Sequence, residues 1–533
     1  MTTNTNSDSG SLSASLAPRR ALGLDSLRRA AQSTTVQVFV LALLSAAVYW
    51  LALVRPYSLQ QWWTVPLQAI GKMSHFAPPA GISYTLAISA LFILYWKACQ
   101  LAHDTTVPFG RHLWLVVLGG ALVFNALLMF QYPVDAADIF DYIIRGRMQV
   151  FHNGNPFYQV PNAFPDDPLL KYVAWTGVFT AYGPGWELLS AQLARLAGDD
   201  VLTNIFVYKS VSVLAYAGTA LVIALLLKRS APQRALYGVT LFAWNPLVVY
   251  STAGSGHHDA LMVFFVVLGF YFLWRKNFTL AALAVTAGAL VKYIPAFVLP
   301  VILLAALIQL KDWRARLGYL LTTAGACMLL ATAVIAPYWR GGDFIDFSRK
   351  STLFTTSLPT LLMVKLEEYL PERLAQVMAG RVALILLGAW ILRELLVLWR
   401  RRAQTPFPFE RYVQAGASIL LFYLLVSDLW FQPWYVIWPL ALAAVLPDGI
   451  VSRGAHVLAF ASMMKMPIFD FVLVRGGPLP PVSWREWPLT IGTLFAPWFY
   501  FLFHLVKRIV RRGSSATWNL SQPKLRADPA PTE

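Results

Sequence analysis

Charged side chains are scarce in this chain. Asp, Glu, Lys and Arg together make up 13% of its 533 residues, whereas 57% of the residues are hydrophobic. A water-soluble core of this length has no room for that much apolar surface. The shortage of charge therefore excludes a soluble globular protein and indicates an all-α polytopic membrane protein, in which lipid covers the apolar side chains.

Cysteine is nearly absent as well. Cys99 and Cys327 both lie inside apolar runs and at no spacing typical of metal ligands, which excludes a disulfide framework and a cysteine-ligated zinc site. A small-residue cleavage site is also missing after the first apolar run. We therefore predict that this run is retained as a membrane helix and is not a removable signal peptide.

Basic residues outnumber acidic ones, and the formal net charge is +17. They cluster in short loops between apolar runs, which is typical of a membrane protein and not of a nucleic-acid-binding surface. Nucleic acid is therefore excluded as a partner. By the positive-inside rule the face that carries these clusters is cytoplasmic, so both termini are predicted inside a multi-pass plasma-membrane protein. The clusters are Arg19/Arg20/Arg28/Arg29, Lys228/Arg229/Arg234, Arg275/Lys276, Lys311/Arg314/Arg316, Arg400/Arg401/Arg402/Arg411 and Lys507/Arg508/Arg511/Arg512.

About fourteen apolar runs approach the length needed to cross a hydrocarbon layer of about 30 Å. Fusing two of them, 278–291 and 294–310, would put the basic clusters around them on opposite faces, so we predict a hairpin. Residues 1–34 form a disordered cytoplasmic N-terminus, 35–510 the transmembrane domain and 511–533 a disordered cytoplasmic tail. The predicted spans are 36–54, 81–101, 113–131, 203–227, 235–252, 258–274, 278–291, 294–310, 317–337, 382–399, 412–430, 433–447, 454–471 and 489–507.

Long external loops are predicted at 132–202 and 338–381, and the unusual polar residues gather on that same external side. Any one such motif is ordinary for an external turn, but five on one face indicate a site. These motifs are "YPVDAADIFDYIIRGR" (132–147) with "HNGNPFY" (152–158), "YGPGWE" (182–187), "GSGHHDA" (254–260), Lys292 in "LVKYIP" and "SDLWFQPWYVIWP" (427–439).

Three acids begin the first loop. Read as a helix, Asp135 and Asp138 share a face, whereas Asp141 points away and has Arg145 four residues later as an ion-pair partner. Asp138 has no base at i+3 or i+4, so it is the carboxylate left for general-base chemistry. Asp135 either caps the helix or supplies a second polar contact, and it stays the alternative base.

Cationic and aromatic residues complete the pattern. Lys292 and His257 suit an anion at the membrane edge, while Lys209 either joins them or extends its amine toward the interface. Nucleotide-activated sugars are cytoplasmic, so an external transferase needs a donor carried in the membrane, for which a lipid phosphate is the obvious form. Flat rings with polar tips suit sugar rings, prenyl chains and headgroups alike. They are Trp430, Trp434, Tyr435 and Trp438.

The order of these motifs resembles the GT-C-fold glycosyltransferases that use polyprenyl-phosphate sugars, most closely the bacterial polyprenyl-phosphate-mannose mannosyltransferases. "DIFDYIIRGRMQVFHNGNPFY" resembles their acid-bearing first external loop, and the later motifs resemble their Gly-His-x-Asp turn, their hairpin lysine and their Pro-Trp-Tyr-x-x-Trp. The residues concerned are Asp138, Tyr142, Gly146, Arg147, Asn155, Pro156 and Tyr158, then Gly256, His257 and Asp259, Lys292, and Pro433, Trp434, Tyr435 and Trp438.

The resemblance implies a GT-C-like bundle and inverting transfer of a hexose, mannose by similarity, from the lipid phosphate to a glycan or glycolipid hydroxyl outside. Asp138 is then the base, with Tyr142, Arg147, Asp259, Lys292 and the motif aromatics as donor-binding residues. No metal or other cofactor is expected, although Asp135, Asp138, His257 and Asp259 have the ligand atoms for a divalent ion. A lipid-linked-glycan flippase or secondary transporter is the alternative, and would place ionisable groups at mid-membrane.

Overall fold

The computed structural model describes residues 33–66, 69–103, 110–135, 137–342, 344, 353–403 and 409–520, with side chains to Lys507. Within these ranges the chain is helical and contains no strand beyond two isolated bridges, which confirms the all-α prediction. Residues 1–32 and 521–533 of the predicted disordered termini lie outside the described residues. The last helix, α23 (Val482–Leu520), continues ten residues into the predicted tail.

Each predicted span overlaps a helical segment. Among the described residues, eight helices are long and apolar enough to cross a membrane and four shorter apolar helices accompany them, so the count of fourteen stays a prediction. The main helices are α2 (Thr34–Val48), α5 (Pro78–His103), α6 (Arg111–Leu128), α7 (Asp138–Phe151), α8 (Pro184–Ala197), α9 (Val201–Ser230), α10 (Ala235–Ala243), α12 (Asp259–Trp274), α13 (Phe278–Val291), α14 (Leu299–Gln309), α15 (Trp313–Ile335), α18 (Glu372–Arg400), α19 (Glu410–Phe422), α20 (Ile437–Val445), α21 (Ile450–Met463) and α23. The short ones are α3 (Leu59–Trp62), α4 (Ile70–Met73), α11 (Pro246–Val249), α17 (Leu358–Leu366) and α22 (Lys465–Pro467), with π-helical turns η1 (Tyr49–Val54), η5 (Tyr250–Gly254), η7 (Tyr423–Ser427) and η9 (Ile468–Val474) and 3-10 turns η2 (Pro161–Ala163), η3 (Leu170–Tyr172), η4 (Pro232–Arg234), η6 (Ile294–Phe297) and η8 (Pro433–Val436).

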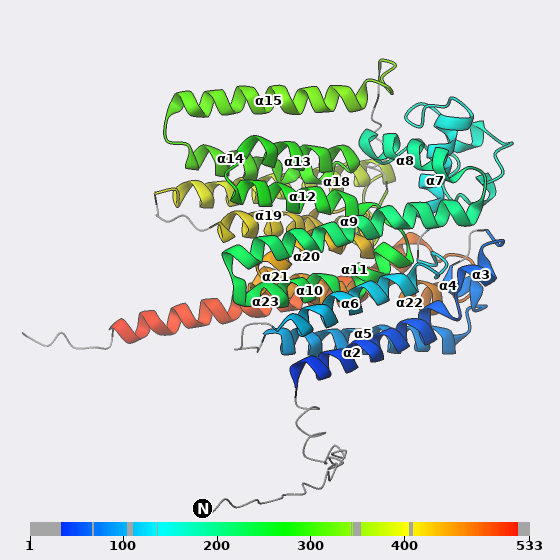
Figure 1. The fold of residues 1–533 in the computed structure, drawn as a ribbon, viewed down its shortest axis with the longest axis horizontal. Helices are drawn as coiled ribbons and strands as arrows, with labels where there is room; N and C mark the ends of the chain where they lie inside the picture. Colours follow the sequence, from blue (N-terminus) through cyan, green and yellow to red (C-terminus); the bar gives the residue numbers. More distant parts are fainter. Residues whose placement is uncertain are drawn as a thin grey trace, which may run out of the picture.

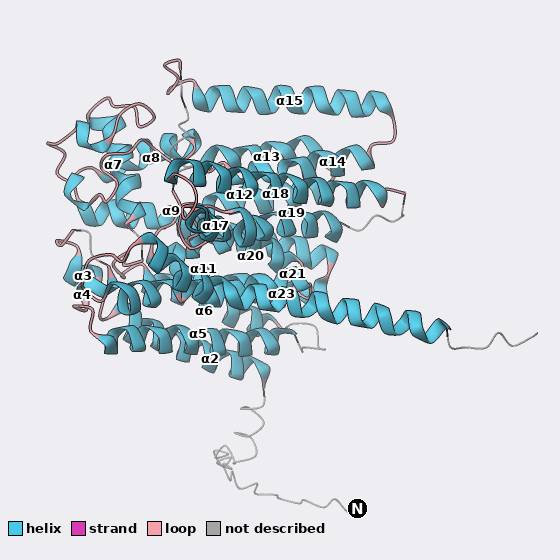
Figure 2. Cartoon of the chain, turned by 180° about the vertical axis from the view of Figure 1, so that it is seen from behind, coloured by secondary structure: helices cyan, strands magenta, loops and turns pink. Residues whose placement is uncertain are grey.

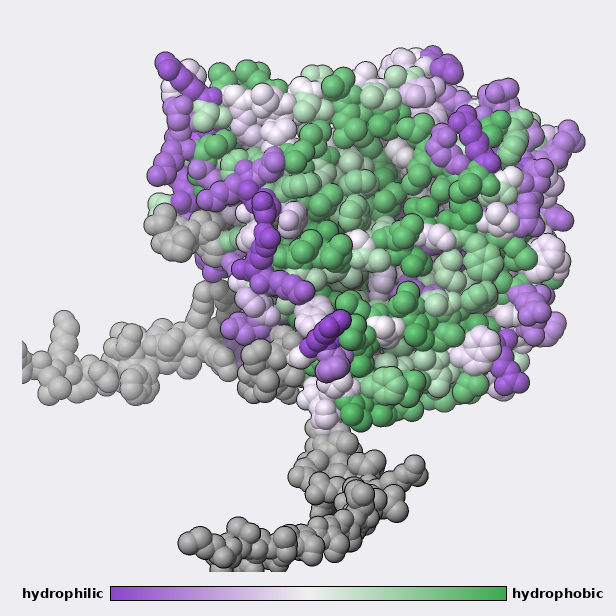
Figure 3. All heavy atoms as spheres, viewed as in Figure 1, coloured by the Kyte–Doolittle hydropathy of each residue, from purple (hydrophilic) through white to green (hydrophobic). Residues whose placement is uncertain are grey.

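The long helices run side by side, and their two ends differ. Figures 1 and 2 show α7, α8, α3 and α4 together at one end, while α2 begins and α23 projects at the other. In Figure 3 an apolar band crosses the middle of the molecule between hydrophilic edges. This band is what a helix bundle surrounded by lipid presents, and it leaves α7 and α8 beyond the apolar zone.

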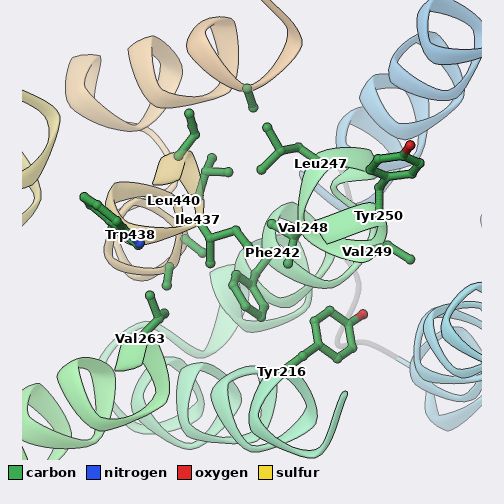
Figure 4. Packing of buried hydrophobic residues seen from close by; sticks show 14 of the residues in the cluster. Tyr216, Phe242, Leu247, Val248, Val249, Tyr250, Val263, Ile437, Trp438 and Leu440 are labelled. Carbon is green, nitrogen blue, oxygen red and sulfur yellow. The ribbon is translucent and has the colours of Figure 1, made fainter. Parts of the chain in front are cut away.

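The centre of the bundle is one continuous apolar cluster. Close helix crossings use small residues, as at Gly238 of α10, where an added Cβ would come within 2.5 Å of the Ala444 carbonyl oxygen of α20. Figure 4 shows side chains of α9, α10, α11, η5, α12 and α20 in this cluster: Tyr216, Phe242, Leu247, Val248, Val249, Tyr250, Val263, Ile437, Trp438 and Leu440. This packing places the turns after η5 and before α20 next to each other.

The described part of the second external loop contains more helix than predicted. Its range, 338–381, holds α17 and the first ten residues of α18, which starts at Glu372 directly after Pro371. The segment 372–381 is polar enough to resemble a loop in sequence. It is helical because Ala375 and Ala379 pack into a small satellite core with α17.

Candidate active site

The helix that carries Asp138 begins at this residue. Ala137 precedes it and no side chain caps the helix, so the prediction that Asp135 caps α7 or shares a helix face with Asp138 was wrong. The cause lies upstream, where Tyr132 donates its backbone N–H to the Tyr57 carbonyl and a bridge pairs Gln131 with another segment. This pairing fixes residues 131 and 132 against the segment of Tyr57 and Ser58, and residues 132–135 are not helical.

The predicted pair of Asp141 and Arg145 is confirmed. Arg145 Nε lies 2.9 Å from Asp141 Oδ2 and Nη2 lies 3.0 Å from Oδ1, while Nη2 also donates to the Val178 carbonyl at 3.0 Å. Both side chains are buried. The bidentate pair therefore joins α7 to the loop that follows it and leaves Asp138 without a partner on its own helix.

Arg147 does not join the other predicted site residues. Its Nε donates to Asp167 at 2.9 Å, Nη1 to the Gly198 carbonyl at 2.7 Å and Nη2 to Asp199 at 2.8 Å. His152 Nε2 lies 2.9 Å from the second Asp167 oxygen. We call these four side chains the Arg147 network, and it ties α7 to both ends of the loop that contains α8.

Lys209 also lies elsewhere. It is fully buried on α9, and its amine donates to the carbonyls of Leu128 and Met129 at 3.3 Å and of Gln131 at 2.5 Å. These carbonyls lie at the C-terminal end of α6, where no intrahelical donor remains. Lys209 therefore caps α6, and it neither extends to the interface nor faces the proposed anion.

Asp138 meets His257 at the end of the bundle that holds α7 and α8. His257 Nδ1 lies 3.9 Å from Asp138 Oδ2, and the imidazole stacks on the Trp434 ring with 4.0 Å between centroids. Gly256 precedes it with a φ of 71°, a left-handed turn in which a Cβ would also strike Ile139 at 2.7 Å. This turn aims His257 at α7.

Asp259 and Lys292 form the second half of the site. Lys292 Nζ and Trp438 Nε1 both donate to Asp259 Oδ1 at 2.7 Å. The ammonium lies 4.3 Å from the centroid of the Tyr435 ring and 5.1 Å from that of Trp438. The lysine is thus fixed by one carboxylate oxygen and two aromatic faces, with 13% of its side chain exposed. We call Asp138, His257, Asp259 and Lys292 the lysine–histidine cluster.

Lys292 lies in the turn of the predicted hairpin. The helices α13 and α14 are separate and in contact, as predicted, with Lys292 in extended conformation between them. This turn is bonded to the first long loop, because Gly183 donates its N–H to the Val291 carbonyl at 3.0 Å and the Tyr293 hydroxyl donates to the Tyr182 carbonyl at 3.1 Å. The loop that carries Asp138 and the turn that carries Lys292 therefore form one unit.

The acid–base properties of the cluster follow from its burial. Burial, reinforced by the nearby Asp141 carboxylate, raises the pKa of Asp138 to about 7, and the positive charge of Lys292 opposes this shift. Burial lowers the pKa of His257 to about 3, so its imidazole is neutral. The neutral imidazole can offer an anion a hydrogen-bond donor but no positive charge, which corrects the cationic character that we expected of His257.

Asp135 does not belong to the lysine–histidine cluster. It lines a narrow cavity with Tyr84 of α5, Tyr250 of η5 and Met466 of α22. Burial raises its pKa to about 7 as well, and the charge of Lys465 opposes that shift. Asp138, and not Asp135, therefore lies within 4 Å of another residue of the lysine–histidine cluster.

Tyr142 is fully buried behind the cluster. Its ring packs edge-on against Tyr182, Trp186 and His258, and its hydroxyl has no hydrogen-bond partner in the structure. Of the doubled histidines, His257 faces Asp138, whereas His258 lies within this aromatic group. Tyr142 therefore supports the wall of the site and does not reach its opening.

Two functional candidates were missed by sequence reasoning. Asp428 is buried, accepts from the Tyr423 hydroxyl at 3.1 Å and from the Trp430 N–H at 3.2 Å, and keeps Oδ2 without a partner. Lys465 donates to the Phe431 carbonyl at 2.6 Å and to a neighbouring glutamine. The available signals were an acid at the start of "DLWFQPWY" and a single lysine within an apolar run.

Metal-binding geometry is not found among the described residues, since no three His, Cys, Asp or Glu side chains there are grouped to hold an ion. Of Asp135 and Asp138, which the sequence offered as ligands together, Asp135 lines the narrow cavity with Tyr84 and Tyr250, and Asp138 lies 3.9 Å from His257. Metal independence stays a prediction.

The chain was compared with known proteins. Residues 35–308 match the family described as alpha-(1->6)-mannopyranosyltransferase, N-terminal domain. The chain belongs to this family. All residues of the lysine–histidine cluster lie inside the matched range, whereas the aromatic turn at 433–438 follows it. The predicted resemblance to bacterial mannosyltransferases of the GT-C type is thereby confirmed, as is the class of membrane glycosyltransferase.

Two curated relatives carry the name alpha-(1->6)-mannopyranosyltransferase A. The protein from Mycobacterium tuberculosis is 24% identical over 435 residues, which cover 74% of this chain and 76% of the relative. The protein from Corynebacterium glutamicum is 25% identical over 175 residues, which cover 32% of this chain and 35% of the relative. The second match therefore spans about a third of the relative's length.

Proposed function

We propose that this chain transfers mannose, with inversion, from a polyprenyl-phosphate-linked donor to a hydroxyl of a glycan or glycolipid acceptor. The reaction takes place at the end of the bundle that carries α7 and α8, which is extracytoplasmic. One observation carries the proposal. A carboxylate with a raised pKa, Asp138, and a fixed cation, Lys292, share a site walled by aromatic rings.

Lys292 binds the donor phosphate. One of its three N–H bonds goes to Asp259, which leaves donors for an incoming phosphate oxygen on the side that is exposed. Both nitrogens of the neutral His257 imidazole lack partners, so its N–H is a second donor to that anion. Such preorganised donors stabilise the charge that develops on the leaving phosphate.

Asp138 activates the acceptor. Its carboxylate takes the proton of the acceptor hydroxyl as that oxygen attacks C1 of the mannosyl group. The C1–O bond to phosphate breaks at the same time, and the electron pair leaves with the polyprenyl phosphate. A single displacement of this kind inverts C1, and the proton on Asp138 is later lost to water. A carboxyl with a pKa of about 7 suits this role near neutral pH.

Orientation and cofactor use follow from charge. The basic clusters indicate that the opposite end of the bundle faces the cytoplasm, where nucleotide sugars are made. A monophosphate leaving group carries less charge than a pyrophosphate, and Lys292 with His257 supplies the stabilisation. The proposed reaction therefore uses no metal ion.

The test is transfer by the purified chain in lipid nanodiscs. Polyprenyl-phosphate-[14C]mannose and nucleotide-activated mannose are offered separately, with octyl α-mannoside as acceptor. We expect product from the lipid donor alone, unchanged by EDTA, with a new 1→6 linkage of inverted anomeric configuration by NMR. Product from the nucleotide sugar, or retained configuration, would contradict the proposal. Movement of the lipid donor across vesicles without a new glycosidic bond would instead identify a flippase.

A further inference from the structure

A cavity of about 510 Å3 is lined mostly by residues of the second long loop, and it includes Trp430 of the aromatic motif at 427–439. It opens between α17, the start of α18 and the start of α23, and we call it the α17 pocket. Its size lies in the range of about 300 to 1,000 Å3 that is typical of small-molecule sites. The side chains that define its chemistry are Phe354, Glu367, Glu372, Gln376, Trp430 and Arg485.

The pocket is structurally joined to the site. Thr355 donates its N–H to the Leu429 carbonyl at 3.0 Å and accepts from the Phe431 N–H at 3.2 Å, so that Phe354 and Trp430 are held on one short bridge. The Trp430 N–H bonds to Asp428 at 3.2 Å. Trp430 is thus bonded to the segment of Asp428, and Trp434, four positions later in the sequence, stacks on His257 of the cluster.

The electrostatics of the pocket disfavour an anion. Glu367 and Glu372 both face it, and the two are close enough that Glu372, together with burial, raises the pKa of Glu367. Arg485 is the one cation among the residues that line it, and its Nε already donates to the buried Glu486 at 3.1 Å. A lipid phosphate in the pocket would thus meet two carboxylates and a guanidinium that is already paired, whereas the Lys292 ammonium keeps N–H donors that Asp259 does not use.

The same groups suit a neutral polyol. Carboxylate and amide oxygens accept hydrogen bonds from sugar hydroxyls, and Gln376 is already oriented by Glu372 at 3.0 Å. Indole faces cover the apolar face of a sugar ring. A second indole is at hand, since Trp175 of the first loop lies edge-on to Trp430 with centroids 6.3 Å apart and is 39% exposed.

We infer that the α17 pocket binds a neutral sugar residue, and that this residue belongs to the acceptor glycan. Binding of a sugar follows from the pocket itself, whereas its assignment to the acceptor depends on the proposed function. The donor's phosphate is placed at Lys292, so its mannose lies between that lysine and Asp138. The acceptor hydroxyl must reach Asp138 from another direction, and the segment from Trp430 to Trp434, which stacks on His257, connects the pocket to the cluster.

Binding is tested without transfer. The full chain in nanodiscs, without donor, is irradiated with a diazirine-bearing benzyl α-mannoside, and labelled peptides are found by mass spectrometry. We expect label on residues 353–376 or on the peptide of Trp430, reduced by competing mannobiose but not by mannose 1-phosphate. Label confined to other segments would overturn the inference. Label in the pocket of a chain that shows no transfer would leave the sugar site standing and refute the proposed function.

Kinetics separate acceptor from donor. Trp430→Ala and the double variant Glu367→Gln/Glu372→Gln are expected to raise KM for octyl α-mannoside roughly tenfold and to leave KM for the lipid donor within twofold. Trp484→Ala is the matched control, since Trp484 is 79% exposed near the start of α23 and outside the pocket. The glutamine variants keep size and shape, which guards against misfolding. An unchanged acceptor KM in both variants, or an equal rise for the donor, would refute the assignment.

Discussion

Two polar groups in this protein lie on neighbouring elements and are satisfied to very different degrees. In the Arg147 network the guanidinium has an acceptor for each of its nitrogens, and both Asp167 oxygens are bonded. In the lysine–histidine cluster both His257 nitrogens and one Asp259 oxygen have no hydrogen-bond partner, although these atoms are buried. The first group is complete without a ligand, and the second is not.

We interpret this difference as a division between charges that serve folding and charges that serve the proposed chemistry. A buried polar atom without a partner costs about 1–3 kcal/mol, so a fold retains several only where something else compensates. A bound phosphate and a sugar hydroxyl would supply the missing partners here. Substitutions in the lysine–histidine cluster should accordingly lower activity, whereas substitutions in the Arg147 network should lower stability.

Asp138→Asn should have the largest effect. Removing the base is expected to lower kcat by about 10²- to 10⁴-fold, with no loss of thermal stability, because Asp138 is in contact with the unsatisfied group. The measurement is transfer from polyprenyl-phosphate-mannose beside a melting curve of the same preparation. Asp135→Asn serves as the matched control. If that variant loses activity and Asp138→Asn keeps it, the base is Asp135.

Lys292→Met should lower kcat/KM for the donor by about 10²- to 10³-fold, since it removes the principal charge that faces the leaving phosphate. It also leaves Asp259 buried without its ion-pair partner, which destabilises the chain. The double variant Lys292→Met/Asp259→Asn removes that second effect. Recovered stability with activity still absent supports a role for Lys292 in binding phosphate, whereas recovered activity would show that the lysine is structural.

Arg147→Met should destabilise the folded chain by about 3–5 kcal/mol, because it leaves the buried Asp167 carboxylate without its guanidinium partner. Chain that remains folded at low temperature should keep kcat/KM within a few-fold. Thermal unfolding in detergent and initial rates are the two measurements. Arg147→Met/Asp167→Asn is expected to regain part of the stability. A large rise in donor KM at unchanged stability would instead show that Arg147 binds the donor, as the sequence analysis expected.

The pH dependence of kcat/KM tests the same comparison and is the smallest of the expected effects. Because the base acts when ionised and its pKa is about 7, kcat/KM should be level above this pH and fall up to tenfold per unit below it. The loss is reversible, since the Arg147 network does not share this titration. Burial raises the pKa of Asp167, but hydrogen bonds from Arg147, the Leu169 N–H and His152 lower it overall, so that network weakens only in acid. A flat profile between pH 5.5 and 8 would contradict the assignment of Asp138.

Much of this could be predicted from local pattern. Apolar runs of membrane-spanning length correspond to helices, the pair of Asp141 and Arg145 forms as its spacing indicates, and the hairpin around Lys292 is present. These features depend on neighbours within a few residues. The start of α18 escaped prediction because its packing partner, α17, lies across a loop.

The fold gives different roles to cationic side chains that are similar in the sequence. Arg147, through the family resemblance, and Lys209, as an alternative, were candidate cations beside Lys292, yet Asp167 and Asp199 engage the first and the end of α6 engages the second. Asp428 was missed although its hydrogen-bond partners Tyr423 and Trp430 are close in sequence, because its burial cannot be seen in the sequence. The partner of a charge, 20 to 80 positions away, decided its use.

The sequence by itself determined the solvent of this protein, its helices, its family and the set of charges from which a site is built, because hydropathy and motif order are properties of the chain alone. The tertiary structure alone decided which of those charges are neutralised. That choice depends on distance and burial, since a carboxylate or ammonium removed from water must find a partner nearby, and those without one are left for a ligand.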